Sequence, residues 1–222
     1  MTALRRLASA LIVAISGSAS LAAPDATSGG MPPGRYQVII ANTNPGQNFS
    51  PPVLVLHRPA YRLFELGRPA SEALWQLAEE GATAAFEALG DPAVHAVVVA
   101  PAVHRRNSPV VTTELEAPEG LALSLAAMLS LTNDGFVAAQ AVALPAAVGA
   151  SISADLRAYD AGSEANTESC AHVPCEVHGR RMTAGAEGAV REHPGLRGDA
   201  DIPSSRQWHE PVLGRLTIIR LR

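Results

Sequence analysis

The sequence contains no lysine. Its 17 basic residues are all arginines, and with 21 acidic residues they give the 222-residue chain a formal net charge of −4. We attribute this one-sided choice of basic residue to genome composition rather than to chemistry. No stretch of the sequence gathers its arginines into a basic face, which argues against a nucleic acid as partner. The length is sufficient for one domain with a full hydrophobic core.

Motifs of the common catalytic classes are missing as well. The sequence has no Gly-x-Ser-x-Gly elbow, no His-Glu-x-x-His pair and no phosphate-binding loop. Among the seven histidines, His193 follows Glu192 and could act as a general base, but a histidine before Pro-Gly is more typical of a surface turn. We therefore expect a protein without catalytic activity, with an uncharacterised hydrolase as the alternative.

Beyond the N-terminus, no apolar run is long enough to span a bilayer. The N-terminus itself carries Arg5 and Arg6, a short apolar run, and small residues up to Ala22 and Ala23. This pattern predicts a signal peptide over residues 1–23 that is cleaved near Ala22 or Ala23 and directs the protein to the periplasm or the exterior; an uncleaved anchor is the alternative. Cleavage leaves 15 arginines against 21 acidic residues, a net charge of −6. A flexible linker over residues 24–34 and one domain over residues 35–222 follow.

Cysteine is scarce, with Cys170 and Cys175 as the only two. Export places them in an oxidising compartment, so we predict a disulfide that closes a short loop. The alternative is a zinc site in which His172 and His178 join the two cysteines. That spacing does not match the closed patterns of structural zinc sites.

The remaining pattern predicts a mainly β fold. Runs in which apolar and polar residues alternate, or in which Val and Leu follow one another, are typical of strands. We expect strands at residues 36–40, 53–57, 96–100, 110–117, 121–131, 136–144 and 212–221, of which the run at 121–131 is ambiguous between strand and helix. The first and last of these strands are expected to pair in one sheet. Residues 166–205 have little periodicity and predict a long loop.

One segment has a helical period instead. Leu74 and Leu77 fall on one face, Ser71 is suited to cap the start of a helix, and Gly81 is suited to end it. A second short helix is expected before Gly90. We interpret this segment as a short helical insertion that packs against the sheet.

Two acidic turns carry the strongest functional signal. Asp134 precedes Gly135, and Asp160 and Glu164 flank Gly162. Because glycine lets the backbone turn tightly and bring carbonyl oxygens to a cation, these turns predict a Ca²⁺ site at one end of a β-sandwich, with Asp134, Asp160 and Glu164 as ligands. Asp before Gly is also a routine turn residue, which leaves purely structural turns open.

These turns belong to a set of segments that resembles the spondin domain family. The segments are residues 36–44, 49–52, 63–67, 69–72, TNDGF at 132–136 and YDAGSEAN at 159–166. The family is named after the N-terminal module of F-spondin and includes stand-alone exported bacterial proteins. The resemblance covers residues 35–221 and implies an antiparallel β-sandwich similar to C2 domains, with a bound Ca²⁺.

On matching positions, the resemblance carries the calcium ligands onto Asp134, Asp160 and Glu164. Glu164 departs from the aspartate of animal members and is one methylene longer. The chain lacks the thrombospondin-type repeats of F-spondin, so matrix and axon-guidance roles do not transfer.

The sequence and the resemblance together predict an exported calcium-binding interaction or cell-adhesion module. Its expected partner is an extracellular protein, a glycan or a membrane surface. The alternative is a module that binds a membrane surface or a glycan only when calcium is bound.

Overall fold

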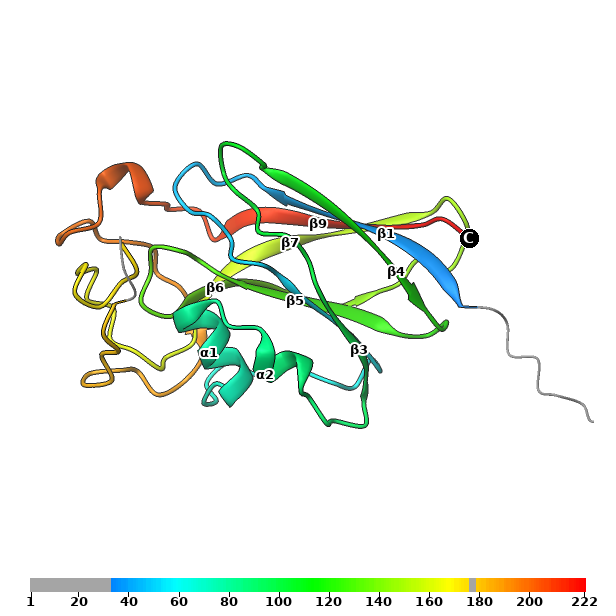
Figure 1. Ribbon diagram of the computed structural model, residues 1–222, viewed down its shortest axis with the longest axis horizontal. Coiled ribbons are helices and arrows are strands. Elements are labelled where there is room, and N and C mark those ends of the chain that lie inside the picture. Colours follow the sequence, from blue (N-terminus) through cyan, green and yellow to red (C-terminus); the bar gives the residue numbers. More distant parts are fainter. Residues whose placement is uncertain (1–32, 176–178) are drawn as a thin grey trace, which may run out of the picture. The chain divides into compact units, whose positions relative to one another are not determined.

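The computed structural model describes residues 33–175 and 179–222 (Figure 1). The predicted signal peptide and most of the predicted linker lie outside the described residues. The strands are β1 (Gly34–Asn42), β2 (Val53–His57), β3 (Val94–Val99), β4 (Val110–Ala117), β5 (Ala122–Met128), β6 (Gly135–Ala143), β7 (Ser151–Asp160), β8 (Arg191–Glu192) and β9 (Val212–Arg220). The helices are α1 (Glu72–Glu80), α2 (Ala84–Glu87) and the 3₁₀ helix η1 (Ser204–Arg206).

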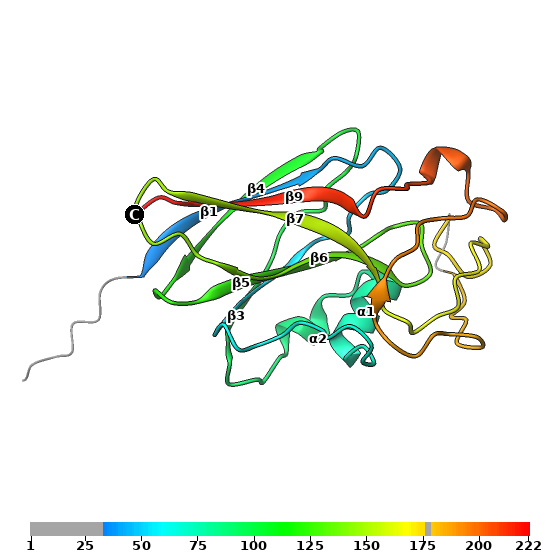
Figure 2. The ribbon, with the colours of Figure 1, turned by 180° about the vertical axis from the view of Figure 1, so that it is seen from behind.

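All strand pairs are antiparallel, and they form one sheet in the order β3-β2-β5-β6-β7-β9-β1-β4, with β8 added to the end of β7. The sheet folds over on itself, so that β7, β9, β1 and β4 lie across from β6, β5, β2 and β3 (Figures 1 and 2). The mainly β, antiparallel prediction is confirmed. The sandwich-like arrangement comes from a single sheet that is nearly closed into a barrel.

The main core fills the space between the two halves of the sheet. Strand β1 shows how alternation produces it: Tyr36, Val38 and Ile40 are at most 1% exposed, while the residues between them are only partly covered. The same core takes in Leu123 and Leu125 of β5. Burial of one such side chain contributes about 1.5–3 kcal/mol to folding, which makes this core the main source of stability.

The two α-helices cover the outer face of the sheet, where α1 contacts β5 and β6 and α2 contacts β3. Ser71 accepts a hydrogen bond from the Leu74 backbone N–H at 3.3 Å and caps α1, which ends at Gly81 in the left-handed region at φ 68°. Leu74 and Leu77 are fully buried in a second core that includes Phe136 of β6. The predicted helical insertion is confirmed. Within the described residues, no helix is long and apolar enough to cross a membrane.

The predicted strands are all present, and the ambiguous run at 121–131 contains strand β5. The predicted pairing of the chain ends is confirmed by β1 and β9, which align Val38 with Ile218. The sequence interpretation missed β7, although Ile152 and Leu156 mark an alternation over its whole length. Residues 166–205 are mostly loop as predicted, but they also contain β8 and part of η1.

Cys170 and Cys175 form the predicted disulfide, with their Cα atoms 5.4 Å apart. The sulfur atoms are bonded to each other, so the alternative of a zinc site on these cysteines is wrong. His178, which that alternative also required, lies outside the described residues. The disulfide closes a turn in the long loop that follows β7.

Candidate metal site

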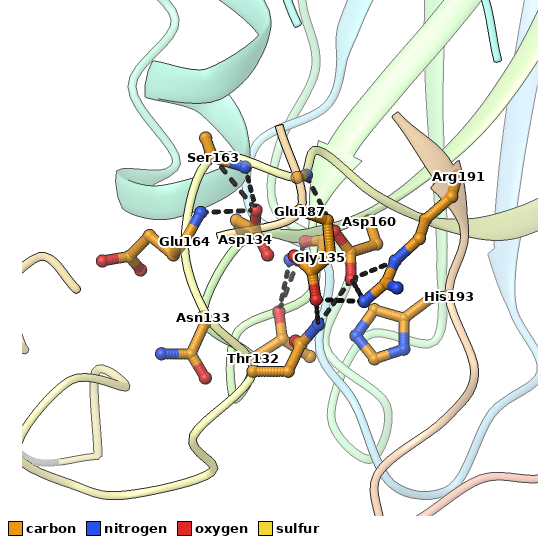
Figure 3. Close-up of polar contacts among 12 residues, drawn as sticks. Thr132, Asn133, Asp134, Gly135, Asp160, Ser163, Glu164, Glu187, Arg191 and His193 are labelled. Carbon is orange, nitrogen blue, oxygen red and sulfur yellow. Dashed lines mark hydrogen bonds and ion pairs between the residues drawn. The ribbon is translucent and has the colours of Figure 1, made fainter. Parts of the chain in front are cut away.

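The two acidic turns meet because β6 and β7 pair. Asp134 immediately precedes β6 and Asp160 ends β7, where it is aligned with Gly135. The Ala161 backbone N–H donates to the Asp134 carbonyl at 3.1 Å and joins the two turns. Thr132 shapes the first turn, because its hydroxyl accepts from the Gly135 backbone N–H at 3.0 Å. Figure 3 shows Asp134 and Asp160 close together at this end of the sheet.

Asp134 is fully buried, and its two oxygens differ sharply. Oδ2 accepts hydrogen bonds from the Ser163 backbone N–H at 2.6 Å, the Ser163 hydroxyl at 3.2 Å and the Glu164 backbone N–H at 3.0 Å. Oδ1 has no hydrogen-bond partner among the described residues. Burial, and then the negative charge of Asp160, raise the pKa of Asp134 to about 7.

Asp160 is also fully buried, but it has a positive partner. Its Oδ1 accepts from the Gly162 backbone N–H at 2.7 Å, and its Oδ2 accepts from Asn166 Nδ2 at 2.5 Å. Arg191, from β8, donates to the same Oδ2 at 3.1 Å. Among the described residues, Arg191 is the one cation paired with either of these two carboxylates; it contacts Asp160 but not Asp134, and it also forms an ion pair with Glu187.

Glycine is required in the second turn. Gly162 has φ +67°, and a Cβ on it would lie 2.3 Å from the Ala189 carbonyl oxygen. The loop that precedes β8 therefore packs directly against this turn. A larger residue at 162 would separate the turn from that loop.

Glu164, the third predicted ligand, points away from the other two carboxylates (Figure 3). Its carboxylate accepts a hydrogen bond from the Met182 backbone N–H and lines a cavity of about 280 Å³ together with Glu79 and Glu80. Burial is the largest cause that raises the pKa of Glu164 to about 7. Within residues 33–175 and 179–222, no three His, Cys, Asp or Glu side chains form a group that could hold a metal ion.

His193 lies beside this site, and the prediction of a surface turn is wrong for its side chain. The ring is 7% exposed and packs on Trp208 at a centroid distance of 4.9 Å. Its Nδ1 accepts from the Gly195 backbone N–H at 3.0 Å, whereas its Nε2 has no partner among the described residues. Burial lowers the pKa of His193 to about 4, so the ring is neutral at pH 7. Glu192 forms an ion pair with Arg157 at 3.2 Å instead of contacting the ring.

Two further residues near the site hold the long loop after β7 in place, and the sequence analysis did not predict this role for either of them. The Asn133 side-chain oxygen accepts from the Thr167 backbone N–H at 3.0 Å. Glu168 is buried, and its carboxylate accepts from the backbone N–H groups of Arg197 at 2.6 Å and Gly198 at 2.7 Å. No local sequence pattern marks Glu168, because its partners lie about thirty residues away.

The residues present fit part of a cation site. The unpartnered Oδ1 of Asp134 and the adjacent buried carboxylate of Asp160 are hard oxygen donors with a shortage of positive charge. Ca²⁺ takes six to eight oxygens, so backbone carbonyls and water would have to supply the rest. As oriented, Glu164 does not belong to this set.

Comparison with known protein families identifies the family of this chain. No curated protein matches the chain. The sequence profile described as Spondin_N matches residues 41–182, more than half of the chain, and includes Asp134, Asp160 and Glu164. The matched part begins at the end of β1 and ends within the long loop after β7. The chain therefore belongs to the spondin N-terminal domain family.

Proposed function

We propose that this protein is an exported calcium-binding interaction module without catalytic activity of its own. The observation that carries the proposal is the fully buried Oδ1 of Asp134, which has no partner among the described residues and lies beside a second buried carboxylate. A buried charge without a partner is costly, so a site of this kind is expected to bind a proton or a cation.

Asp134 and Asp160 are the ligands that we assign to the ion. A bound Ca²⁺ supplies positive charge between the two carboxylates and joins the turns before β6 and after β7. Glu164 is a third ligand only if its side chain leaves the Met182 backbone N–H. Ca²⁺ is preferred over Mg²⁺, because loop ligands of mixed reach suit a large cation with flexible geometry.

The interaction role is supported by membership of the spondin N-terminal domain family, which suggests an extracellular module. The Cys170–Cys175 disulfide supports export, since such bonds persist in oxidising compartments. We propose that the folded-over sheet corresponds to the C2-like sandwich expected from the resemblance. Partners are an extracellular protein, a glycan or a membrane surface, and cell adhesion is the process that such binding serves.

Thermal unfolding in Ca²⁺ and in chelator tests the proposal. If the dissociation constant is about 10⁻⁴ M, as in weak extracellular sites, 1 mM Ca²⁺ stabilises the native protein by about 1.4 kcal/mol. Asp160→Ala should abolish the response. Asp155→Asn is the matched control, because Asp155 lies on the same strand, is exposed and pairs with Arg215. An equal calcium response in the wild type and Asp160→Ala would reject the site.

A further inference from the structure

The fold brings together three arginines that come from distant parts of the sequence. Arg105 and Arg106 lie in the loop between β3 and β4, and Arg206 ends η1, one hundred residues later. These loops and the turn between β1 and β2 gather at the same end of the sheet as the acidic turns (Figures 1 and 2). We call these three residues the arginine cluster.

Two of the guanidinium groups are held side by side by one turn. Arg105 donates to the Pro45 carbonyl at 2.6 Å, and Arg206 donates to the next carbonyl, that of Gly46, at 3.0 Å. The Asn48 side chain also accepts from the Arg105 backbone N–H at 3.1 Å. Two like charges are thus fixed on consecutive carbonyls.

The turn that holds the arginines is itself rigid. The buried Asn44 side chain accepts from the backbone N–H groups of Gly46 at 2.7 Å and Gln47 at 2.9 Å. Gln47 is fully buried; it donates to the Arg206 carbonyl at 3.0 Å and accepts from the Leu131 backbone N–H at 3.0 Å. The arginine cluster and the loop that leads to the metal site therefore share one support.

No carboxylate among the described residues forms an ion pair with the arginine cluster. Eight other arginines form ion pairs, but Arg105, Arg106 and Arg206 form none with the described residues. Desolvation, followed by the charges of Arg206 and Arg106, lowers the pKa of Arg105. A chain with excess negative charge thus keeps three cations together without neutralising them.

We propose that the arginine cluster binds an anionic polysaccharide through its sulfate or carboxylate groups. The guanidinium fork matches both groups with paired hydrogen bonds. The adjoining surface cavity, about 160 Å³, is lined by the amides of Asn48 and Asn107, by His104 and by two of the arginines. Amides suit sugar hydroxyls. Among the described residues no apolar side chain lines this cavity, whereas membrane-surface binding uses apolar groups that enter the lipid.

This inference rests on the proposed role as an interaction module, and it does not require the calcium site. Calcium binding is therefore measured separately on the same samples. Loss of sugar binding in an arginine variant that still binds Ca²⁺ identifies the cluster as a site in its own right.

The test is calorimetric titration of the purified protein with a heparin-derived hexasaccharide and with hexagalacturonate, which carry sulfate and carboxylate groups respectively. Arg105→Gln/Arg206→Gln should weaken binding by at least roughly tenfold, because each lost charge-assisted hydrogen bond is worth about that factor. Arg58→Gln/Arg62→Gln is the control with the same change of charge. Both residues are exposed, form no ion pair with described residues, and follow the opposite end of β2.

The proposal is overturned if neither oligosaccharide binds, or if the control variant loses as much affinity as the cluster variant. Binding to phosphatidylglycerol vesicles in place of both sugars would overturn it in favour of a membrane surface. Should the double variant not fold, Arg106→Gln decides, since Arg106 is exposed and its side chain makes no hydrogen bond to described residues. It should lower affinity by roughly threefold, and unchanged binding contradicts the proposal.

Discussion

Replacement of Asp134 by Asn probes the charge balance of the metal site. The Asn side-chain oxygen can accept the three hydrogen bonds that Oδ2 now accepts from Ser163 and Glu164. Its NH₂ group takes the place of the buried, unpartnered Oδ1. The substitution therefore removes the charge and keeps the shape of the turn.

The magnitude follows from the pKa of Asp134. Folding raises this pKa from 3.8 to about 7, and each unit corresponds to 1.36 kcal/mol, so the charged form costs the folded state about 4 kcal/mol. Because the folded state binds the proton more tightly, the stability from this group is full below pH 4. It is lost as the pH rises to about 7. Asp134→Asn has no carboxyl group at this position, so its stability does not fall in this way as the pH rises.

Urea unfolding in chelator from pH 4 to pH 8 measures this difference. The free energy of unfolding of Asp134→Asn, minus that of the wild type, should rise by about 3 kcal/mol between pH 4 and pH 7. Asp155→Asn changes an exposed carboxylate and should show no such rise. A difference that stays constant with pH, or that falls as the pH rises, would refute the reasoning.

Three further predictions concern the surroundings of the site. Arg191→Gln removes the only charged partner of Asp160 among the described residues, so it should lower the free energy of unfolding in chelator by about 2 kcal/mol. Ca²⁺ should restore part of this loss, and equal losses in chelator and in Ca²⁺ would contradict the prediction. Gly162 has a positive φ, and Gly162→Ala places a Cβ 2.3 Å from a carbonyl oxygen, so the free energy of unfolding should fall by about 1–3 kcal/mol. Calorimetry should also show weaker Ca²⁺ binding, and wild-type stability would contradict the prediction. Removal of the Cys170–Cys175 disulfide by double Ser substitution should cost about 2 kcal/mol in urea unfolding and leave the circular dichroism of the sheet unchanged; loss of the sheet signal would contradict a local role.

The sequence predicted most of the strands because their period is local. Alternation in β1 and β4, and the fully buried run of β2, follow directly from side chains that point to opposite faces or to two cores. The alternation in β7 has the same period, but Ala154 and Ala158 carry much of it and give a weak hydrophobic signal.

The candidate site was only partly predictable for a different reason. Glycine-containing turns placed Asp134 and Asp160 at strand ends, and the pairing of β6 with β7 then brought them together. The Glu164 carboxylate is held by the Met182 backbone N–H, and Asp160 accepts a hydrogen bond from Arg191; both partners lie far along the chain. Such contacts depend on the path of the long loop. That loop has no hydrophobic periodicity from which its path could be predicted.

The arginine cluster illustrates the same limit at the surface. Arg105 and Arg206 are one hundred and one residues apart, and Arg206 has no neighbouring arginine in the sequence. The buried Gln47 joins η1 to the loop before β6 through two hydrogen bonds to backbone groups. Only the folded chain shows that an acidic protein carries a concentrated positive site.

Equilibrium dialysis of the purified protein against radioactive Ca²⁺ tests the central claim most directly. The wild type and Asp155→Asn should each bind one Ca²⁺ per chain, and Asp134→Asn/Asp160→Asn should bind none at the same free concentration. A wild type that binds no Ca²⁺ up to 10 mM, well above the weak extracellular range of about 10⁻⁴–10⁻³ M, would contradict the account. So would a double variant that binds as the wild type does.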